Sequence, residues 1–186
     1  MSIRPSPAEG FDITTETLIV GAGAAGLIAA LSAQEAGQDV LVLEADPVPS
    51  GSTALSAGLI PAPGTRAQKA AGIEDSAALF AADIMRKAKG ENDPELVVAM
   101  TEGVGDAIDW LSDAYGLPFT VIDDFTYPGH SRRRMHGLPS RAGIDLINAL
   151  RATAETEGVQ IATERRVEVL FADPDGTIRG VEAVRP

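Results

Sequence analysis

The sequence contains no cysteine among its 186 residues. Without thiols the chain can form no disulfide, ligate no iron–sulfur cluster and carry out no thiol redox chemistry. Any redox chemistry must therefore come from a bound cofactor. We expect no metal site.

Basic residues are also scarce, since 15 Lys and Arg stand against 27 Asp and Glu, for a formal net charge of −12. Affinity for nucleic acid depends mainly on cationic side chains, so this balance argues against a nucleic-acid partner. It does not argue against a dinucleotide, because backbone N–H groups at a helix N-terminus can hold a pyrophosphate.

Long apolar runs and targeting segments are missing as well. No run approaches the roughly 18 apolar residues that span a bilayer. Residues 1–10 contain Arg4, Glu9 and two prolines, without the apolar core of a signal peptide. We therefore expect no membrane segment and a cytoplasmic location.

What is present begins with a glycine cluster near the N-terminus. The β-branched run at residues 17–20 predicts a buried strand that ends at the cluster Gly21-Ala22-Gly23-Ala24-Ala25-Gly26. Residues 24–36 are rich in Ala and Leu and predict a helix, and residues 40–43 predict a second strand. Strand, helix and strand within about 30 residues predict a βαβ unit.

Each glycine has a separate role in such a unit. Gly21 permits the tight turn, Gly23 lets the backbone approach a pyrophosphate, and Gly26 lets the helix lie close to the sheet. Glu44 follows the second strand, where it can accept hydrogen bonds from ribose hydroxyls. A 2′-phosphate would meet this carboxylate, so NADP is disfavoured, while NAD and FAD both remain open.

The stretch of small and hydroxyl-bearing residues at 50–60 favours FAD. An NAD-binding domain would enter a helix here, whereas a loop of small residues suits an extended ligand lying flat across the backbone. A flexible linker is a poor alternative, because Leu55, Leu59 and Ile60 would then be exposed.

The middle of the chain predicts helices, one capped by Asp75 or Ser76 and running to Lys87, and one from the pair Asp93-Pro94 to about Tyr115. We expect Trp110 to pack in the core. The apolar positions of the second helix recur at helical spacing and are also expected in the core: Leu96, Val97, Met100, Val104, Ile108 and Leu111.

The C-terminal part returns to β structure. Residues 143–157 predict an amphipathic helix and residues 159–163 a third parallel strand. Residues 166–172 and 177–184 alternate around the turn sequence Asp173-Pro174-Asp175-Gly176 and predict a hairpin.

The polar stretch at residues 123–141 gathers both histidines and four arginines. It is interpreted either as an anion-facing part of an active site or as a solvated loop whose arginines pair with surface carboxylates. Its members are His130, Arg132, Arg133, Arg134, His136 and Arg141.

Several short motifs in order resemble one family of flavoproteins. They are Gly51-Ser52-Thr53, Ser56-Ala57-Gly58, the stretches 72–76, 92–96 and 107–111, and Arg134-Met135-His136 followed by Gly143. From about Glu16 onward the sequence resembles the flavoprotein subunits of the fumarate reductase and succinate dehydrogenase superfamily, especially the soluble fumarate-reductase-like and ketosteroid-dehydrogenase-like branch.

The resemblance implies an α/β, Rossmann-like FAD-binding domain with a parallel sheet. After an N-terminal arm at 1–15, this domain covers 16–186, with a helical insertion at about 74–142 and a β-meander at about 165–185. The family's capping domain and catalytic arginine do not follow Pro186, so we expect the remainder of the flavoprotein beyond Pro186 or on another chain.

The resemblance also implies non-covalent FAD, because Ser52 stands where some relatives attach the flavin through a histidine. Ala45 follows Glu44 where the family often has a basic residue. Arg134 and His136 are the substrate-side candidates. The expected FAD-binding residues are Gly21, Gly23, Ala24, Ala25, Gly26, Glu44, Ala45, Gly51, Ser52, Thr53, Ser56, Ala57, Gly58, Leu59 and Val167.

The activity implied for the parent protein is hydride transfer between FAD and a small enoate or enone, fumarate-like or ketosteroid-like. The chain alone is expected to be incomplete for catalysis, and its electron partner is not identified. The alternatives are an NAD-dependent dehydrogenase domain and a non-catalytic FAD-binding module.

Overall fold

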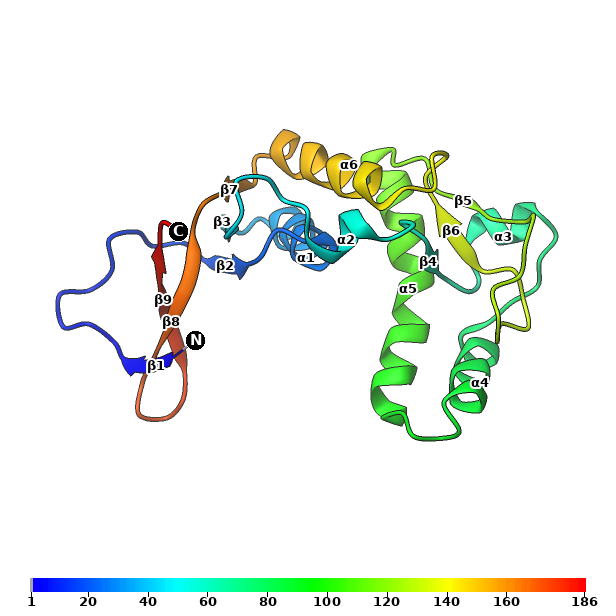
Figure 1. The fold of residues 1–186 in the computed structure, drawn as a ribbon, viewed down its shortest axis with the longest axis horizontal. Coiled ribbons are helices and arrows are strands. Elements are labelled where there is room, and N and C mark those ends of the chain that lie inside the picture. The colour runs from blue at the N-terminus through cyan, green and yellow to red at the C-terminus, as the bar shows by residue number, and fades with distance from the viewer. Residues whose placement is uncertain (1) are drawn as a thin grey trace. The chain divides into compact units, whose positions relative to one another are not determined.

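The computed structural model describes residues 2–186, which fall into two compact units. The first unit combines residues 1–55 with residues 147–186, and the second consists of residues 56–146. The second unit contains the expected insertion at 74–142 and extends beyond it on both sides. Figure 1 shows the order of the elements along the chain.

The first unit contains the predicted βαβ arrangement. Strand β2 (Thr17–Val20) leads into α1 (Ala24–Glu35) and then β3 (Val40–Leu43), which pairs with β2 in parallel. Strand β7 (Gln160–Ala162) pairs in parallel with the other edge of β3, so the sheet order is β2-β3-β7. The Rossmann-like fold class is confirmed.

Burial explains why this sheet forms. Strand β3 lies between two neighbours and is apolar at every position, as expected for a central parallel strand. Helix α1 contacts β2 and β3 and buries Leu27 and Leu31 completely. Each such leucine contributes roughly 1.5–3 kcal/mol of transfer free energy.

A second sheet of the same unit contains the predicted hairpin. Strand β8 (Arg166–Ala172) pairs antiparallel with β9 (Ile178–Val184). Strand β1 (Ser2–Pro5) adds to the free edge of β8 in parallel, aligning Ser2 with Val169. The segment expected to be an N-terminal arm thus contributes a strand.

The second unit is mostly helical. It contains α3 (Arg66–Ala70), α4 (Ala77–Lys87) and α5 (Pro94–Tyr115), with Ser76 and Asp93 as the N-caps of α4 and α5. The predicted starts of both long helices are confirmed. Three short strands form an antiparallel sheet, in the order β4 (Ile60–Pro61), β6 (Met135–Gly137) and β5 (Thr120–Val121). Helix α6 (Gly143–Thr156) begins here and ends in the first unit.

The expected core of α5 is only partly correct. Val97, Ile108 and Leu111 are buried, whereas Leu96 is 68% and Met100 41% exposed. The helix packs on α4 along one narrow face, which leaves these two positions of the apolar stripe without cover within the unit. Trp110 contacts the ring of Tyr115 edge-on, at 5.1 Å between centroids.

Candidate functional site: a glycine turn at the start of helix α1

The turn between β2 and α1 is closed by backbone contacts that admit only glycine. Gly21 has a φ of +98° and donates its N–H to Leu43 O at 2.7 Å. A Cβ on Gly26 would lie 2.0 Å from Gly21 O, so no side chain fits there. The first turn of α1 is therefore held directly against the end of β2.

Two side chains contact backbone N–H groups of this turn. Glu44 Oε2 accepts a hydrogen bond from Ala22 N at 2.8 Å, and its Oε1 accepts one from Asp46 N at 2.9 Å. Thr53 Oγ1 accepts one from Ala24 N, the first residue of α1, at 3.2 Å. Gly23 is the N-cap of α1 and has no side chain of its own to cap the helix.

These contacts join the glycine turn to Glu44 and Thr53 within the first unit. The end of β3 also contacts the start of β8, because Arg165 N donates to Glu44 O at 2.7 Å, two residues before Val167. The predicted residues that belong to the first unit are Gly21, Gly23, Ala24, Ala25, Gly26, Glu44, Ala45, Gly51, Ser52, Thr53 and Val167.

The segment after β3 differs from the expected loop. Residues 51–55 form a short helix, α2 (Gly51–Leu55), in which Ala54 N donates to Ser50 O at 3.2 Å. Gly51 starts it with a φ of +53°, and its small side chains do not obstruct the helical turn. Leu55 is 91% exposed, so the argument that a linker would expose this residue does not hold.

The remaining predicted residues lie in the second unit. Gly58 has a φ of +62°, and a Cβ there would lie 2.9 Å from Ala142 O. Its N–H donates to Ser56 Oγ at 3.0 Å, and Ser56 O accepts from Gly143 N at 2.9 Å. Residues 56–59 are thus bound to the start of α6. This group comprises Ser56, Ala57, Gly58, Leu59, Arg134 and His136.

Arg134 has internal anionic partners, although it was expected to face a substrate. Its side chain is fully buried, with Nε and Nη2 on the two oxygens of Asp75 at 2.8 and 2.9 Å and Nη1 on Asp83 at 2.7 Å. The guanidinium also lies 4.6 Å from the Phe80 ring centroid. Burial by itself lowers the pKa of Arg134, but the hydrogen bonds that its guanidinium donates to the two carboxylates raise the pKa above its usual range.

His136 is likewise fully buried. Its Nδ1 lies 2.9 Å from Arg134 O and its Nε2 lies 2.8 Å from Thr65 Oγ1. A carbonyl only accepts, so Nδ1 carries the proton and Nε2 accepts from the Thr65 hydroxyl. Burial lowers the pKa of His136 and outweighs the contact with the Arg134 carbonyl. The neutral ring is therefore part of the packing of the second unit.

The clustered arginines of residues 123–141 separate in the structure. Arg134 is internal, and Arg141 pairs with Asp124 at 2.8 Å on the surface. Arg132 and Arg133 line one groove, which is described below. The buried partners Asp75 and Asp83 lie more than 50 residues before Arg134 in the chain. Asp75 falls in the stretch 72–76, but nothing in the sequence pairs either carboxylate with Arg134.

Comparison with known proteins supports a dinucleotide-binding role for the glycine turn. A sequence family described as "FAD binding domain" matches residues 16–186. The chain is 34% identical over 182 residues to "Probable fumarate reductase Ifc3" of Shewanella frigidimarina, covering 96% of this chain and 30% of that protein. The chain spans less than a third of the length of this relative.

Two solved structures are similar over nearly the whole chain. The open conformation of a flavocytochrome c3 fumarate reductase matches with a TM-score of 0.84 and 32% identity, over 94% of this chain and 31% of that one. A 3-ketosteroid-Δ4-(5α)-dehydrogenase from Rhodococcus jostii RHA1 matches with a TM-score of 0.82 and 29% identity, over 98% of this chain and 45% of that one.

A parallel sheet with a glycine turn at its first helix defines a dinucleotide-binding domain. The chain belongs to the FAD binding domain family, and its similar proteins include fumarate reductases. This membership resolves the choice between NAD and FAD that the βαβ unit leaves open. Within residues 2–186, no helix is long and apolar enough to cross a membrane.

Proposed function

We propose that this chain forms the FAD-holding part of an oxidoreductase that transfers hydride between FAD and a small enoate or enone. The observation that carries the proposal is the Gly21–Gly26 turn. A Cβ on Gly26 would lie 2.0 Å from Gly21 O, so only glycine fits there, and the N-cap Gly23 has no side chain to cover the backbone at the start of α1. The names of the relatives support the substrate class, since they include fumarate and urocanate reductases and a ketosteroid dehydrogenase.

The start of α1 fits a pyrophosphate. The first N–H groups of a helix have no acceptor within the helix, and the helix dipole favours an anion there. In the structure, the hydroxyl of Thr53 accepts from Ala24 N. We propose that the backbone of Gly23, Ala24 and Ala25 holds the pyrophosphate of FAD, with the Thr53 hydroxyl at its side.

Glu44 is proposed to bind the ribose. Its two oxygens each accept one backbone hydrogen bond, from Ala22 and Asp46, so the carboxylate is held in one orientation. Each carboxylate oxygen has a further lone pair for a hydroxyl donor. Ala45 adjoins this carboxylate, and the backbone of Val167 is proposed to meet the adenine.

Residues 51–59 are proposed to lie against the isoalloxazine ring through Gly51, Ser52 and the segment 56–59. When bound, FAD supplies the hydride chemistry, and the chain's own residues hold and orient it. The flavin is proposed to be non-covalent, with Ser52 in place of a linking histidine. Because Arg134 and His136 already have protein partners, we do not propose that they bind substrate.

The proposal is tested by incubating the purified chain with FAD, removing the excess and recording flavin absorbance. We expect retained FAD that is released on denaturation, and a Glu44→Ala variant that binds about tenfold more weakly because one charged hydrogen bond is lost. Glu168→Ala, which removes an exposed carboxylate of β8, is the matched control and should bind like the unchanged chain. Equal losses in both variants would contradict the role of Glu44.

The reaction itself is tested separately, by supplying a reduced dye and an enoate to a longer protein that contains this chain. Turnover there but not in the 186-residue chain would support the proposed division of roles. FAD binding without turnover in either protein would favour a non-catalytic module. A cytoplasmic location remains part of this proposal and is checked by cell fractionation.

A further inference from the structure

Two exposed arginines of the second unit form no ion pair within residues 2–186, although the chain is strongly acidic. Eight of the twelve arginines form ion pairs within residues 2–186: Arg4, Arg66, Arg86, Arg134, Arg141, Arg151, Arg179 and Arg185. The other four are Arg132, Arg133, Arg165 and Arg166. Of these four, Arg132 and Arg133 line the same groove.

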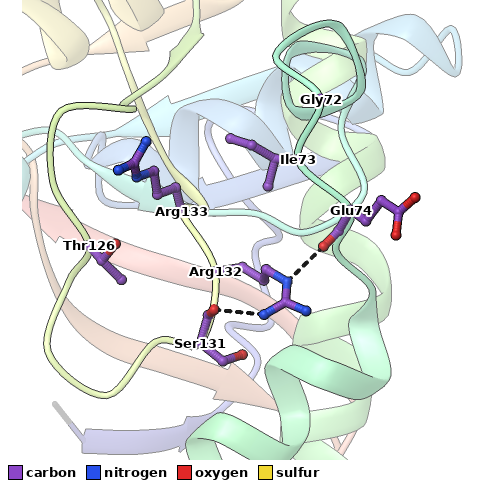
Figure 2. A pocket seen from close by; sticks show the side chains of 7 residues that line it. All are labelled: Gly72, Ile73, Glu74, Thr126, Ser131, Arg132 and Arg133. Carbon is purple, nitrogen blue, oxygen red and sulfur yellow. Dashed lines mark hydrogen bonds between the residues drawn. The ribbon is translucent and has the colours of Figure 1, made fainter.

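The groove lies between the turn at residues 72–74 and the loop at residues 126–133, and its volume is about 490 Å³. Figure 2 shows Arg132, Arg133, Ile73 and Thr126 around it. All of its lining residues belong to the second unit, so the groove is complete within one compact body.

Arg132 is oriented by neutral groups. Its Nε donates to Glu74 O at 3.0 Å and its Nη1 donates to Ser131 O at 2.9 Å. These carbonyls hold the guanidinium in place but do not neutralise it. Its Nη2 has no hydrogen-bond acceptor within the described residues 2–186 and is left for a ligand.

Arg133 is the next residue in the chain, and Figure 2 shows its guanidinium directed to the opposite side from that of Arg132. The Arg133 side chain has no ion pair or hydrogen bond in the part of the chain that the structure describes. Two carboxylates could have compensated it. Glu74 lines the groove, but Figure 2 shows its carboxylate directed away from both guanidinium groups. Asp124 accepts a hydrogen bond from Arg141 at 2.8 Å, which is the main cause of the lowered pKa of Asp124. The charge of Arg133 lowers the pKa of Asp124 further.

We propose that this groove binds an oxyanion carried by a small molecule, either a carboxylate or a phosphate. A guanidinium is planar and presents parallel N–H groups that match two oxygens of either anion. The adjoining Ile73 side chain offers an apolar surface, and the Thr126 hydroxyl a further hydrogen bond. The proposal is independent of FAD binding, because no residue of the glycine turn contributes to the groove.

The test uses the 186-residue chain and two probes, inorganic phosphate and succinate, at low ionic strength. Binding is followed by the NMR signals of the arginine Nε–H groups during titration. We expect saturable shifts of Arg132 and Arg133, with the tighter probe identifying the anion. Arg133→Gln should weaken binding about tenfold, because a charged hydrogen-bonding partner is lost.

Arg166→Gln is the matched control, since it removes an exposed arginine without an ion pair from the first unit. It should leave binding within a factor of about two, as screened charges at a distance contribute little. Arg133 and Arg166 are both exposed, so neither substitution removes a core contact, and amide spectra verify the fold. Equal weakening by Arg166→Gln, or no saturable shift with either probe up to about 20 mM, would overturn the proposal.

Discussion

The Arg134 guanidinium donates from Nη1 to Asp83 Oδ2 at 2.7 Å, and the two side chains are 0% and 1% exposed. Asp83 Oδ2 also accepts from the backbone N–H and the hydroxyl of Ser131. This contact joins α4 to the segment that leads into β6, within the second unit.

Breaking this pair should destabilise the chain strongly. Asp83→Asn leaves the buried guanidinium short of one counter-charge, and breaking a buried pair costs about 3–5 kcal/mol. Arg151→Gln removes an exposed pair with Glu155 and should cost less than about 0.5 kcal/mol. Urea unfolding of both variants measures the difference. Similar losses of stability in the two variants would show that the buried pair contributes no more than an exposed one.

Stability should fall as the solution becomes mildly acidic. Burial lowers the folded-state pKa of both His130 and His136 below the ordinary 6.5. The unfolded chain therefore binds protons first, and stability that is complete above about pH 6.5 is lost as the pH falls below it.

The measurement is the urea midpoint at about pH 7.5 and about pH 5.5. The unchanged chain should unfold at lower urea at the lower pH. A His130→Gln/His136→Gln double variant has no histidine left and should lose this part of the dependence. An unchanged slope in the double variant would assign the effect to other groups.

A further acid transition belongs to the carboxylates of the second unit. Burial raises the pKa of Asp83, but hydrogen bonds from Ser131, Arg134 and Arg86 outweigh it and hold the pKa well below 3.8. Asp75 is shifted in the same direction, where burial is outweighed by hydrogen bonds from Arg134 and Gln68. Their stabilisation is complete above about pH 4 and is lost below it. Acid titration of the Asp83→Asn variant should show a smaller loss over that range.

Two glycines of α5 should respond in opposite directions to alanine. A Cβ on Gly105 would lie 2.3 Å from Pro63 O, a backbone atom that cannot move aside cheaply, whereas a Cβ on Gly103 meets nothing within 4 Å. We expect Gly105→Ala to destabilise by about 1–3 kcal/mol through overpacking and Gly103→Ala to stabilise by up to about 1 kcal/mol. Thermal unfolding compares them within one helix. Two variants of equal stability would refute the close approach at Pro63.

The N-terminal segment should stabilise the hairpin sheet. Phe11 lies 5.8 Å from the Phe171 ring and covers Gly180, while Ile13 is 73% exposed. Phe11→Ala should cost about 0.5–1.5 kcal/mol from the aromatic contact, and Ile13→Ala less than about 0.5. Hydrogen exchange at residues 169–172 should accelerate in the first variant alone. If both variants exchange alike, the segment does not hold β8.

The sequence predicts most elements because their signals are local. Residues 17–20 and 40–43 are apolar runs that suit parallel strands, and Asp93 with Pro94 is a helix start that needs no tertiary contact. The strands β2 and β3 and the start of α5 are found at these positions. The glycine turn can also be predicted, since the spacing of its glycines follows directly from backbone geometry.

Features that depend on distant residues could not be predicted in this way. The partners of Arg134 come from α4 and from the residue before its cap, and no spacing rule links them. Strand β1 is exposed along its whole length and owes its existence to the edge of β8. Helix α2 forms despite a Gly and Ser composition that favours turns, and Gly51 at its start adopts a positive φ.

The alignment of Ser2 with Val169 also constrains how the chain can fold during synthesis. The first unit is assembled from both ends of the chain, whereas residues 56–146 are continuous. A ribosome therefore releases every residue of the second unit before β7, β8 and β9 exist. The helical unit can condense first and β2 can pair with β3, while β1 and the second edge of β3 wait for β8 and β7, made more than a hundred residues later. Such long sequence separations are typical of slow steps, so closure of the FAD-binding sheet is expected to come last.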